Sequence, residues 1–168
     1  MKSSSKLPFI ILFLFSSALN LSTSIYANST NTANTIYSIL SYVKINTPSP
    51  MICTLNNPPL SDQLTKASNS YNKYRIKNVS ISEIKKTNCN VIIFSGSTPK
   101  EEQFILNSHV TFPALSISTN NLHCEVGSAI CLYKKKNQIS FKINLESVNQ
   151  SRVYIDPRIL LLAKESEQ

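Results

Sequence analysis

Residues 88–102 have the sequence Asn-Cys-Asn-Val-Ile-Ile-Phe-Ser-Gly-Ser-Thr-Pro-Lys-Glu-Glu, and this stretch decides the fold of the 168-residue chain. Its continuous apolar run, residues 91–94, predicts a strand that is covered on both faces, which is typical of a parallel sheet flanked by helices. The helix that follows begins favourably, because Pro99 suits a first turn and the carboxylates of Glu101 and Glu102 suit the positive end of the helix dipole. A strand followed directly by a helix indicates an α/β domain.

The chain upstream of this stretch repeats the alternation of helix and strand. Ile36, Ile39, Leu40 and Val43 recur at spacings of three and four, which predicts one apolar stripe on a helix. The expected elements, in order, are this helix from Thr35, a buried strand at Met51–Leu55, a turn at residues 56–59, a helix capped by Ser61 that ends near Asn69, a strand within residues 74–81 and a helical turn at residues 82–86.

The last third predicts a strand at residues 114–117 and then a β-hairpin. The hairpin is formed by residues 129–133 and 138–144. A short helix is expected to begin at Asn144 or Ser147, and a closing helix over residues 159–163 is expected after Asp156 and Pro157. We therefore predict an α/β fold, a single-domain three-layer sandwich with a mixed, mostly parallel sheet, a flavodoxin-like strand order, a β-hairpin and a C-terminal helix.

The N-terminus has the layout of a secretory signal peptide. Residues 1–6 carry two lysines and no acid, an apolar segment follows, and Ala27 offers a small residue for cleavage. The uninterrupted apolar core, residues 9–15, is much shorter than the roughly 20 residues of a membrane-spanning helix. We predict a signal peptide at residues 1–27, a flexible start of the mature chain at residues 28–34 and one domain over residues 35–168.

All four cysteines, Cys53, Cys89, Cys124 and Cys131, lie downstream of this signal. An exported protein keeps disulfides, so the cysteines are predicted to be structural. Four cysteines allow three pairings, and the sequence leaves these open. No metal site is expected, because the chain has only two histidines and no two cysteines stand two to four residues apart.

The chain carries a net charge of +8, which favours anionic surfaces or partners. Two lysine clusters stand out, residues 85–86 and residues 134–136. Aromatic residues are not interleaved with these lysines as they are in single-strand nucleic-acid grooves, and export also disfavours nucleic acid as a partner.

The motifs of common enzymes are absent from the sequence, and no enzymatic activity and no cofactor are expected. No serine stands in a Gly-x-Ser-x-Gly elbow, and no Cys-x-x-Cys pair is present. Glu101 and Glu102 are adjacent and therefore point in different directions on a helix, so both are predicted to complement its dipole. His109 and His123 are predicted to be surface residues.

Three segments together resemble the YfiR-like periplasmic repressors. They are the cysteine-bearing strand at Met51–Leu55, the segment 88–95, and the tail from Gly127, which contains Phe141-Lys142-Ile143-Asn144-Leu145 and the closing Leu160-Leu161-Leu162-Ala163. The similarity extends from about residue 34 to residue 164. The chain departs from the family in lacking its Trp-Pro after the first helix and in having Asn56 where a glycine is usual.

The resemblance implies a periplasmic protein, commonly a homodimer, that binds the periplasmic domain of an inner-membrane diguanylate cyclase and represses cyclic di-GMP production. It also implies that a peptidoglycan-binding outer-membrane lipoprotein draws the repressor away, so that biofilm formation responds to envelope or redox stress. By the same resemblance Cys53 pairs with Cys89 and Cys124 pairs with Cys131.

Two hypotheses follow for the roles of particular residues. The Cys53–Cys89 bridge is expected to staple the core, whereas the Cys124–Cys131 bridge is expected to hold a loop used in recognition or redox sensing. Lys134, Lys135 and Lys136, at the tip of the hairpin, are expected to face the partner. The alternative function is that of a periplasmic small-ligand-binding or envelope interaction protein with the same fold, because α/β sheets bind ligands beyond the carboxyl ends of their strands.

Overall fold

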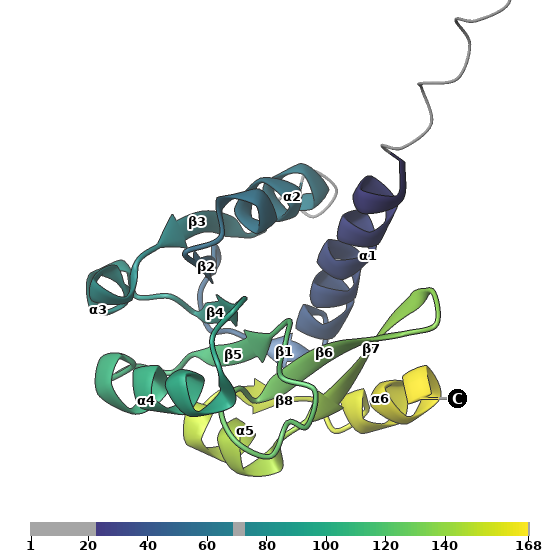
Figure 1. Ribbon diagram of the computed structural model, residues 1–168. Helices are drawn as coiled ribbons and strands as arrows, with labels where there is room; N and C mark the ends of the chain where they lie inside the picture. The colour runs from purple at the N-terminus through teal and green to yellow at the C-terminus, as the bar shows by residue number, and fades with distance from the viewer. Residues whose placement is uncertain (1–22, 69–72, 168) are drawn as a thin grey trace, which may run out of the picture.

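The computed structural model describes residues 23–68 and 73–167, and a six-stranded sheet lies at the centre of this part of the chain (Figure 1). The spatial order is β3-β2-β4-β5-β6-β7, and every neighbouring pair is parallel except the antiparallel hairpin β6–β7. This is the flavodoxin-like order with one hairpin strand added. The strands are β2 (Met51–Leu55), β3 (Arg75–Val79), β4 (Val91–Phe94), β5 (Leu115–Ser118), β6 (Ile130–Lys135) and β7 (Gln138–Ile143).

Helices cover both faces of the sheet (Figure 1). They are α1 (Thr23–Leu40), α2 (Pro58–Ser68), the 3-10 helix η1 (Ile81–Glu83), α3 (Ile84–Thr87), α4 (Pro99–His109), α5 (Leu145–Ser151) and α6 (Ile159–Glu167). One hydrophobic core lies between the sheet and α1, α2 and α6, and a second lies between the sheet and α3 and α4. The predicted α/β fold with a mostly parallel sheet, a hairpin and a C-terminal helix is confirmed.

The apolar run of β4 serves both cores. Val91 and Ile93 belong to the first core, whereas Ile92 and Phe94 belong to the second. Successive side chains of a strand point to opposite faces, so a strand covered on both sides needs an apolar residue at every position. All four residues are fully buried.

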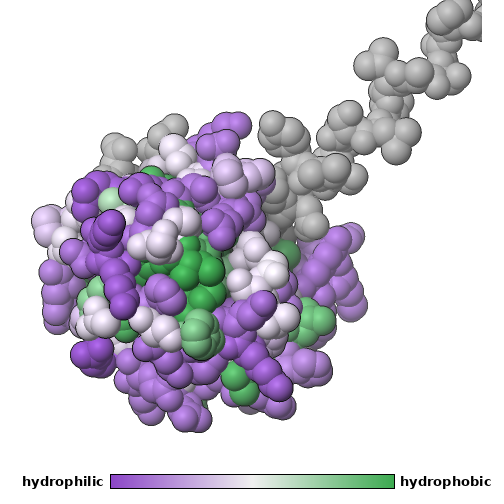
Figure 2. Space-filling model, turned by 60° about the vertical axis from the view of Figure 1, so that its left-hand side comes forward, coloured by the Kyte–Doolittle hydropathy of each residue, from purple (hydrophilic) through white to green (hydrophobic). Residues whose placement is uncertain are grey.

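Several side chains at the edge of the second core are only partly buried. The single turn of α3 buries only Ile84 from its own residues, and Met51, Val110 and Phe112 are partly exposed around this core. Figure 2 brings the side of α3 and α4 forward and shows a hydrophobic patch near the middle of this face, with hydrophilic side chains around it.

The first helix begins earlier than predicted. Residues 28–34, which were expected to be flexible, belong to α1, and Ala33 is buried in the first core together with Ile36. Packing of the apolar stripe stabilises the helix beyond what the low helix propensity of Asn, Ser and Thr would allow. Most of the predicted signal peptide, residues 1–22, lies outside the described residues, and Thr23 to Ala27 are helical. Cleavage after Ala27 stays a prediction.

The start of α2 also differs from the prediction. Asn57 caps this helix: its side-chain oxygen accepts a hydrogen bond from the Leu60 amide at 3.0 Å, and its carbonyl accepts one from the Ser61 amide. Pro58 and Pro59, which were expected to form a turn, occupy the first helical turn, where a missing N–H costs nothing. Ser61 is therefore inside the helix and does not cap it. The expected end near Asn69 lies outside the described residues.

A two-stranded sheet of β1 (Val43–Lys44) and β8 (Tyr154–Ile155) was not predicted. Val43, which was expected on the first helix, pairs with Ile155, and the Asp156 amide donates to the Tyr42 carbonyl at 2.8 Å. This pairing ties the entrance of α6 to the end of α1. Within residues 23–68 and 73–167, no helix is long and apolar enough to cross a membrane.

Candidate functional site

Cys53 and Cys89 form a disulfide inside the second core. Cys53 lies in the middle of β2, and Cys89 lies two residues before β4, its neighbour in the sheet. Both side chains are fully buried. The bridge therefore joins two adjacent central strands at a place that solvent does not reach.

Cys124 and Cys131 form the second disulfide. Cys124 lies in the segment between β5 and β6, residues 119–129, which we name the disulfide loop, and Cys131 lies in β6. Cys124 is 6% exposed and Cys131 is fully buried. The short bridge therefore lies beneath the loop that it holds, and all four cysteines are paired as the family resemblance implied.

A buried carboxylate, which was not predicted, holds the same loop. Glu102 of α4 has no exposed surface. Its Oε1 accepts a hydrogen bond from the Ser118 hydroxyl at 2.6 Å, and its Oε2 accepts bonds from the Ser128 amide at 3.0 Å and the Asn121 side-chain amide at 3.5 Å. Burial of a carboxylate is costly unless hydrogen bonds compensate it. Here neutral donors from the end of β5 and from the disulfide loop provide that compensation.

Glu101 and Glu102 have different roles because they are one residue apart on a helix. Glu101 completes the capping box of α4: Thr98 accepts from the Glu101 amide at 3.3 Å, and the Thr98 amide donates to the Glu101 carboxylate at 2.7 Å. Hydrogen bonds from the backbone and side chain of Thr98 lower the pKa of the Glu101 carboxyl. Both carboxylates lie in the first turn of α4 as predicted, but the burial of Glu102 and its contacts with the loop were not predicted.

A helical spacing in the sequence could have revealed the burial of Glu102. Ile105, three residues further along α4, is the other buried residue of this helix. Residues three apart lie on the same face of a helix. Glu102 thus belongs to the stripe that faces the sheet.

Gly127 lets the loop approach this carboxylate. Its φ is +93°, and a Cβ at this position would lie 2.7 Å from Glu102 Oε2 and 2.8 Å from the Pro99 carbonyl oxygen. Its amide donates to the side chain of Gln103 at 3.2 Å, and its carbonyl accepts from the Ser147 hydroxyl at 2.8 Å. Only glycine fits here without displacing either α4 or the loop.

Asn121 fastens the middle of the loop. It is 2% exposed; its side chain accepts from the Cys124 amide at 3.0 Å and donates to the Val126 carbonyl at 2.7 Å. The Lys142 ammonium of β7 donates to the Leu122 carbonyl at 3.0 Å. The contacts of Asn121 are buried or partly buried and that of Lys142 is exposed, and together they hold the disulfide loop.

The three predicted partner-facing lysines lie at the far end of the hairpin from this loop. Lys134 and Lys135 end β6, and Lys136 stands in the turn with a φ of +53°. Lys134 and Lys136 are exposed. At the other end of the hairpin Cys131 pairs with Lys142, so the lysine cluster and the disulfide loop are two separate surfaces.

The histidines do not form a site with other metal-ligating residues. His123 is exposed as predicted, whereas His109 is partly buried and its Nδ1 has no hydrogen-bond partner among the described residues. The part of the chain that the structure describes contains no group of three His, Cys, Asp or Glu residues that could hold a metal ion.

A comparison with known protein families finds one family that matches most of the chain. The match extends over residues 29–164, which include α1 from residue 29 onward, the whole central sheet and both disulfides. The match also begins before residue 35, in agreement with the packing of α1 onto the core. The matched family is described as YfiR/HmsC-like, and this chain belongs to it.

Proposed function

We propose that this protein is a periplasmic repressor, which binds the periplasmic domain of an inner-membrane diguanylate cyclase and lowers cyclic di-GMP production. The observation that carries the proposal is the family match over residues 29–164. In this proposal the protein itself acts as a regulator and not as a catalyst. Its partners in this proposal are the cyclase, a peptidoglycan-binding outer-membrane lipoprotein that relieves repression, and a second copy of the chain.

Two buried disulfides support the location. Disulfides persist in oxidising compartments such as the bacterial periplasm. Both bridges lie within the matched residues, so they belong to the domain itself. Together with the predicted signal peptide, they favour an exported protein.

The two bridges suggest different duties in repression. Cys53–Cys89 joins the central strands β2 and β4 and stabilises the domain. Cys124–Cys131 shapes the disulfide loop, whose outer residues are exposed. In this proposal the short bridge links the redox state of the envelope to recognition of the cyclase.

A deletion strain tests the function. Loss of a repressor should raise cellular cyclic di-GMP, return of the wild-type gene should lower it again, and deletion of the cyclase gene as well should abolish the rise. Binding of the purified mature protein to the purified periplasmic domain of the cyclase should accompany these results. Unchanged cyclic di-GMP in the deletion strain, or no binding between the two purified proteins, would contradict the proposal.

A further inference from the structure

We propose that Glu102 makes the disulfide loop sensitive to pH: the ionised carboxylate latches the loop to α4, and protonation of this group in acid releases the loop. The proposal rests on the complete burial of Glu102 and on the direction of each hydrogen bond around it. It concerns the folded chain alone, so it does not depend on the partner named in the proposed function.

Every hydrogen bond at the Glu102 carboxylate comes from a donor. At Oε2 the donors are the backbone amide of Ser128 and the side-chain nitrogen of Asn121. The orientation of the Asn121 amide group is fixed, because its oxygen accepts from the Cys124 amide and its nitrogen also donates to the Val126 carbonyl. These partners of Oε2 therefore have no lone pair that could accept a proton from a protonated carboxyl group.

Ser118, the partner of Oε1, has no free lone pair either. Its hydroxyl donates to Glu102, while its oxygen accepts from the backbone amides of Asn120 at 3.3 Å and Asn121 at 3.1 Å. A serine hydroxyl has one proton and two acceptor lone pairs. A proton on Oε1 would therefore cost either the bond between Glu102 and Ser118 or one of the two amide bonds. The network fits the ionised carboxylate and not the neutral acid.

Neither bulk water nor a cation replaces these partners. Glu102 has no exposed surface, and no Lys, Arg or His of the described residues lies within ion-pair distance of it. β5 carries no titratable residue. The titratable residues of α4, the disulfide loop, β6, β7 and α5 form no ion pair with Glu102; they are Lys100, Glu101, His109, His123, Glu125, Tyr133, Lys134, Lys135, Lys142 and Glu146.

The charge state of Glu102 therefore controls the latch. While the carboxyl group is ionised, its hydrogen bonds connect α4 to Ser118 at the end of β5 and to Ser128 near the end of the loop. Their contribution to closure of the loop is present at neutral pH and is lost as the pH falls and the group takes up a proton. The Cys124–Cys131 bridge does not involve the carboxylate, so the loop loosens at its two ends but stays tethered.

Amide hydrogen exchange, followed by NMR in the oxidised mature protein, tests the latch. The protection factor of an amide is the ratio of its intrinsic to its measured exchange rate, which removes the direct effect of pH on exchange. For Ser128 it should fall by at least about 10-fold between about pH 7 and pH 3, because this amide loses a charged acceptor. The amides of β4, which pairs with β2 and β5, should lose much less protection.

Glu102→Gln removes the titrating group. This variant should give a low protection factor at Ser128 at both pH values, without the fall in acid. Glu101→Gln is the matched control, because it removes the adjacent carboxylate, which is exposed and bonds to Thr98 in the capping box. The control should retain the acid response of the wild type.

A measurement on the wild type decides the matter even if Glu102→Gln does not fold. The ¹³C chemical shift of the Glu102 carboxyl carbon reports the protonation of this group directly. It should change over the same pH interval as the protection factor of Ser128.

Three results would overturn the latch. Unchanged protection of Ser128 down to about pH 3 would show that the loop does not respond to acid, as when the buried Ser128 hydroxyl, which has no partner among the described residues, accepts the proton. An equal fall in Glu102→Gln would assign the response to another group, and an equal fall in β4 would assign it to unfolding of the whole domain. None of these results depends on binding to a cyclase, so the latch and the proposed function stand or fail separately.

Discussion

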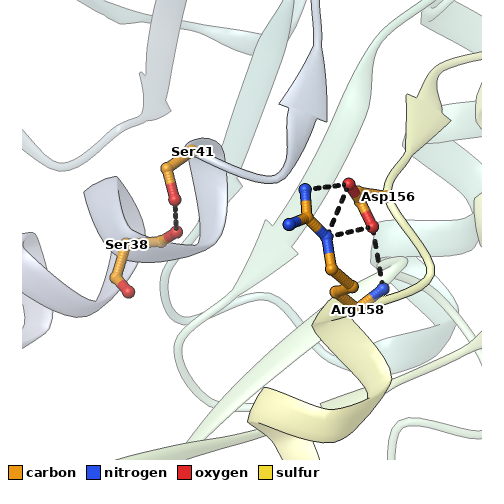
Figure 3. Close-up of polar contacts among 4 residues, drawn as sticks. All are labelled: Ser38, Ser41, Asp156 and Arg158. Atoms are coloured by element: carbon orange, nitrogen blue, oxygen red, sulfur yellow. Dashed lines mark hydrogen bonds and ion pairs between the residues drawn. The ribbon is translucent and has the colours of Figure 1, made fainter.

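Asp156 and Arg158 form a two-pronged ion pair at the entrance to α6 (Figure 3). The Arg158 guanidinium donates to both carboxylate oxygens, at 3.0 Å from Nε and 2.6 Å from Nη2, and the Arg158 amide donates to Oδ1 at 2.9 Å. On the α1 side of the same view, the Ser41 hydroxyl donates to the Ser38 carbonyl at 2.6 Å. Polar contacts between residues close in the sequence therefore lie at the end of α1 and just before the start of α6.

The ion pair predicts a pH dependence of stability. The hydrogen bonds from Arg158 lower the pKa of Asp156 from its ordinary value of 3.8 to about 2. A carboxyl group whose pKa is lower in the folded state stabilises the protein above its unfolded-state pKa, and this contribution is lost as the pH falls through the folded-state value. Asp156→Asn should therefore lower the melting temperature at pH 7, and its difference from the wild type should shrink between about pH 4 and pH 2.

The difference between the two proteins isolates Asp156 from the other carboxylates. The pKa values of Glu83 and Glu101 are also lowered, by hydrogen bonds from Ser80 and Thr98, so the wild type alone loses stability in acid for several reasons. Melting curves by circular dichroism over this pH range provide the measurement. A gap between variant and wild type that stays constant down to pH 2 would show that the ion pair contributes nothing.

At the scale of elements, the two disulfides connect different parts of the structure. Cys53–Cys89 spans 36 positions, and the chain segment that it closes contains α2, β3, η1 and α3. Cys124–Cys131 spans 7 positions and closes only part of the disulfide loop and the start of β6. In the chain-entropy account a cross-link stabilises more when it closes a longer loop. The long bridge therefore acts on the domain and the short one acts locally.

This contrast predicts unequal effects of the two double Cys→Ser variants. Loss of Cys53 and Cys89 should destabilise by about 3.5–4 kcal/mol, and loss of Cys124 and Cys131 should destabilise by about 2.5 kcal/mol. Affinity for the cyclase domain should fall more in the second variant, once both are measured at a temperature where they are folded. Denaturant unfolding and binding titrations check the two properties, and equal losses of both would reject the division of duties.

At the scale of the whole molecule, the positive charge is spread over both layers of helices and the hairpin. Lys134, Lys135 and Lys136 are concentrated at the hairpin tip. Lys44, Lys66 and Lys164 are exposed on β1, α2 and α6 instead. The two sets of three lysines carry the same charge at different places, which makes one a control for the other.

If the hairpin lysines steer association, their replacement with Glu should slow binding to the cyclase's periplasmic domain by roughly 10-fold at low salt. The effect should shrink as salt is added, because screening weakens interactions between exposed charges. The same replacement at Lys44, Lys66 and Lys164 changes the net charge equally and should slow association less. Stopped-flow measurements at several salt concentrations decide the matter, and equal rates for the two triple variants would reject a role for the tip.

The sequence predicted the strands and most helices because their signals are local. The apolar run of β4, the proline and carboxylates of α4 and the alternation of β7 each depend on neighbouring residues. It missed the β1–β8 pairing, because strands of two residues carry no periodic pattern and their pairing joins distant segments. It also placed the start of the first helix too late, because Asn, Ser and Thr give residues 28–34 no apolar period, whereas Ala33 packs into the core.

The sequence by itself determined the fold class, the membership of the family and the four structural cysteines, since these depend on patterns of apolar residues and on residue identities along the chain. Only the tertiary structure decided which donors surround the Glu102 carboxylate and that Gly127 must lack a side chain beside it. The physical reason is that the energy of a carboxylate depends on the donors around it. Those donors come from β5 and the disulfide loop, 16 to 26 residues away along the chain.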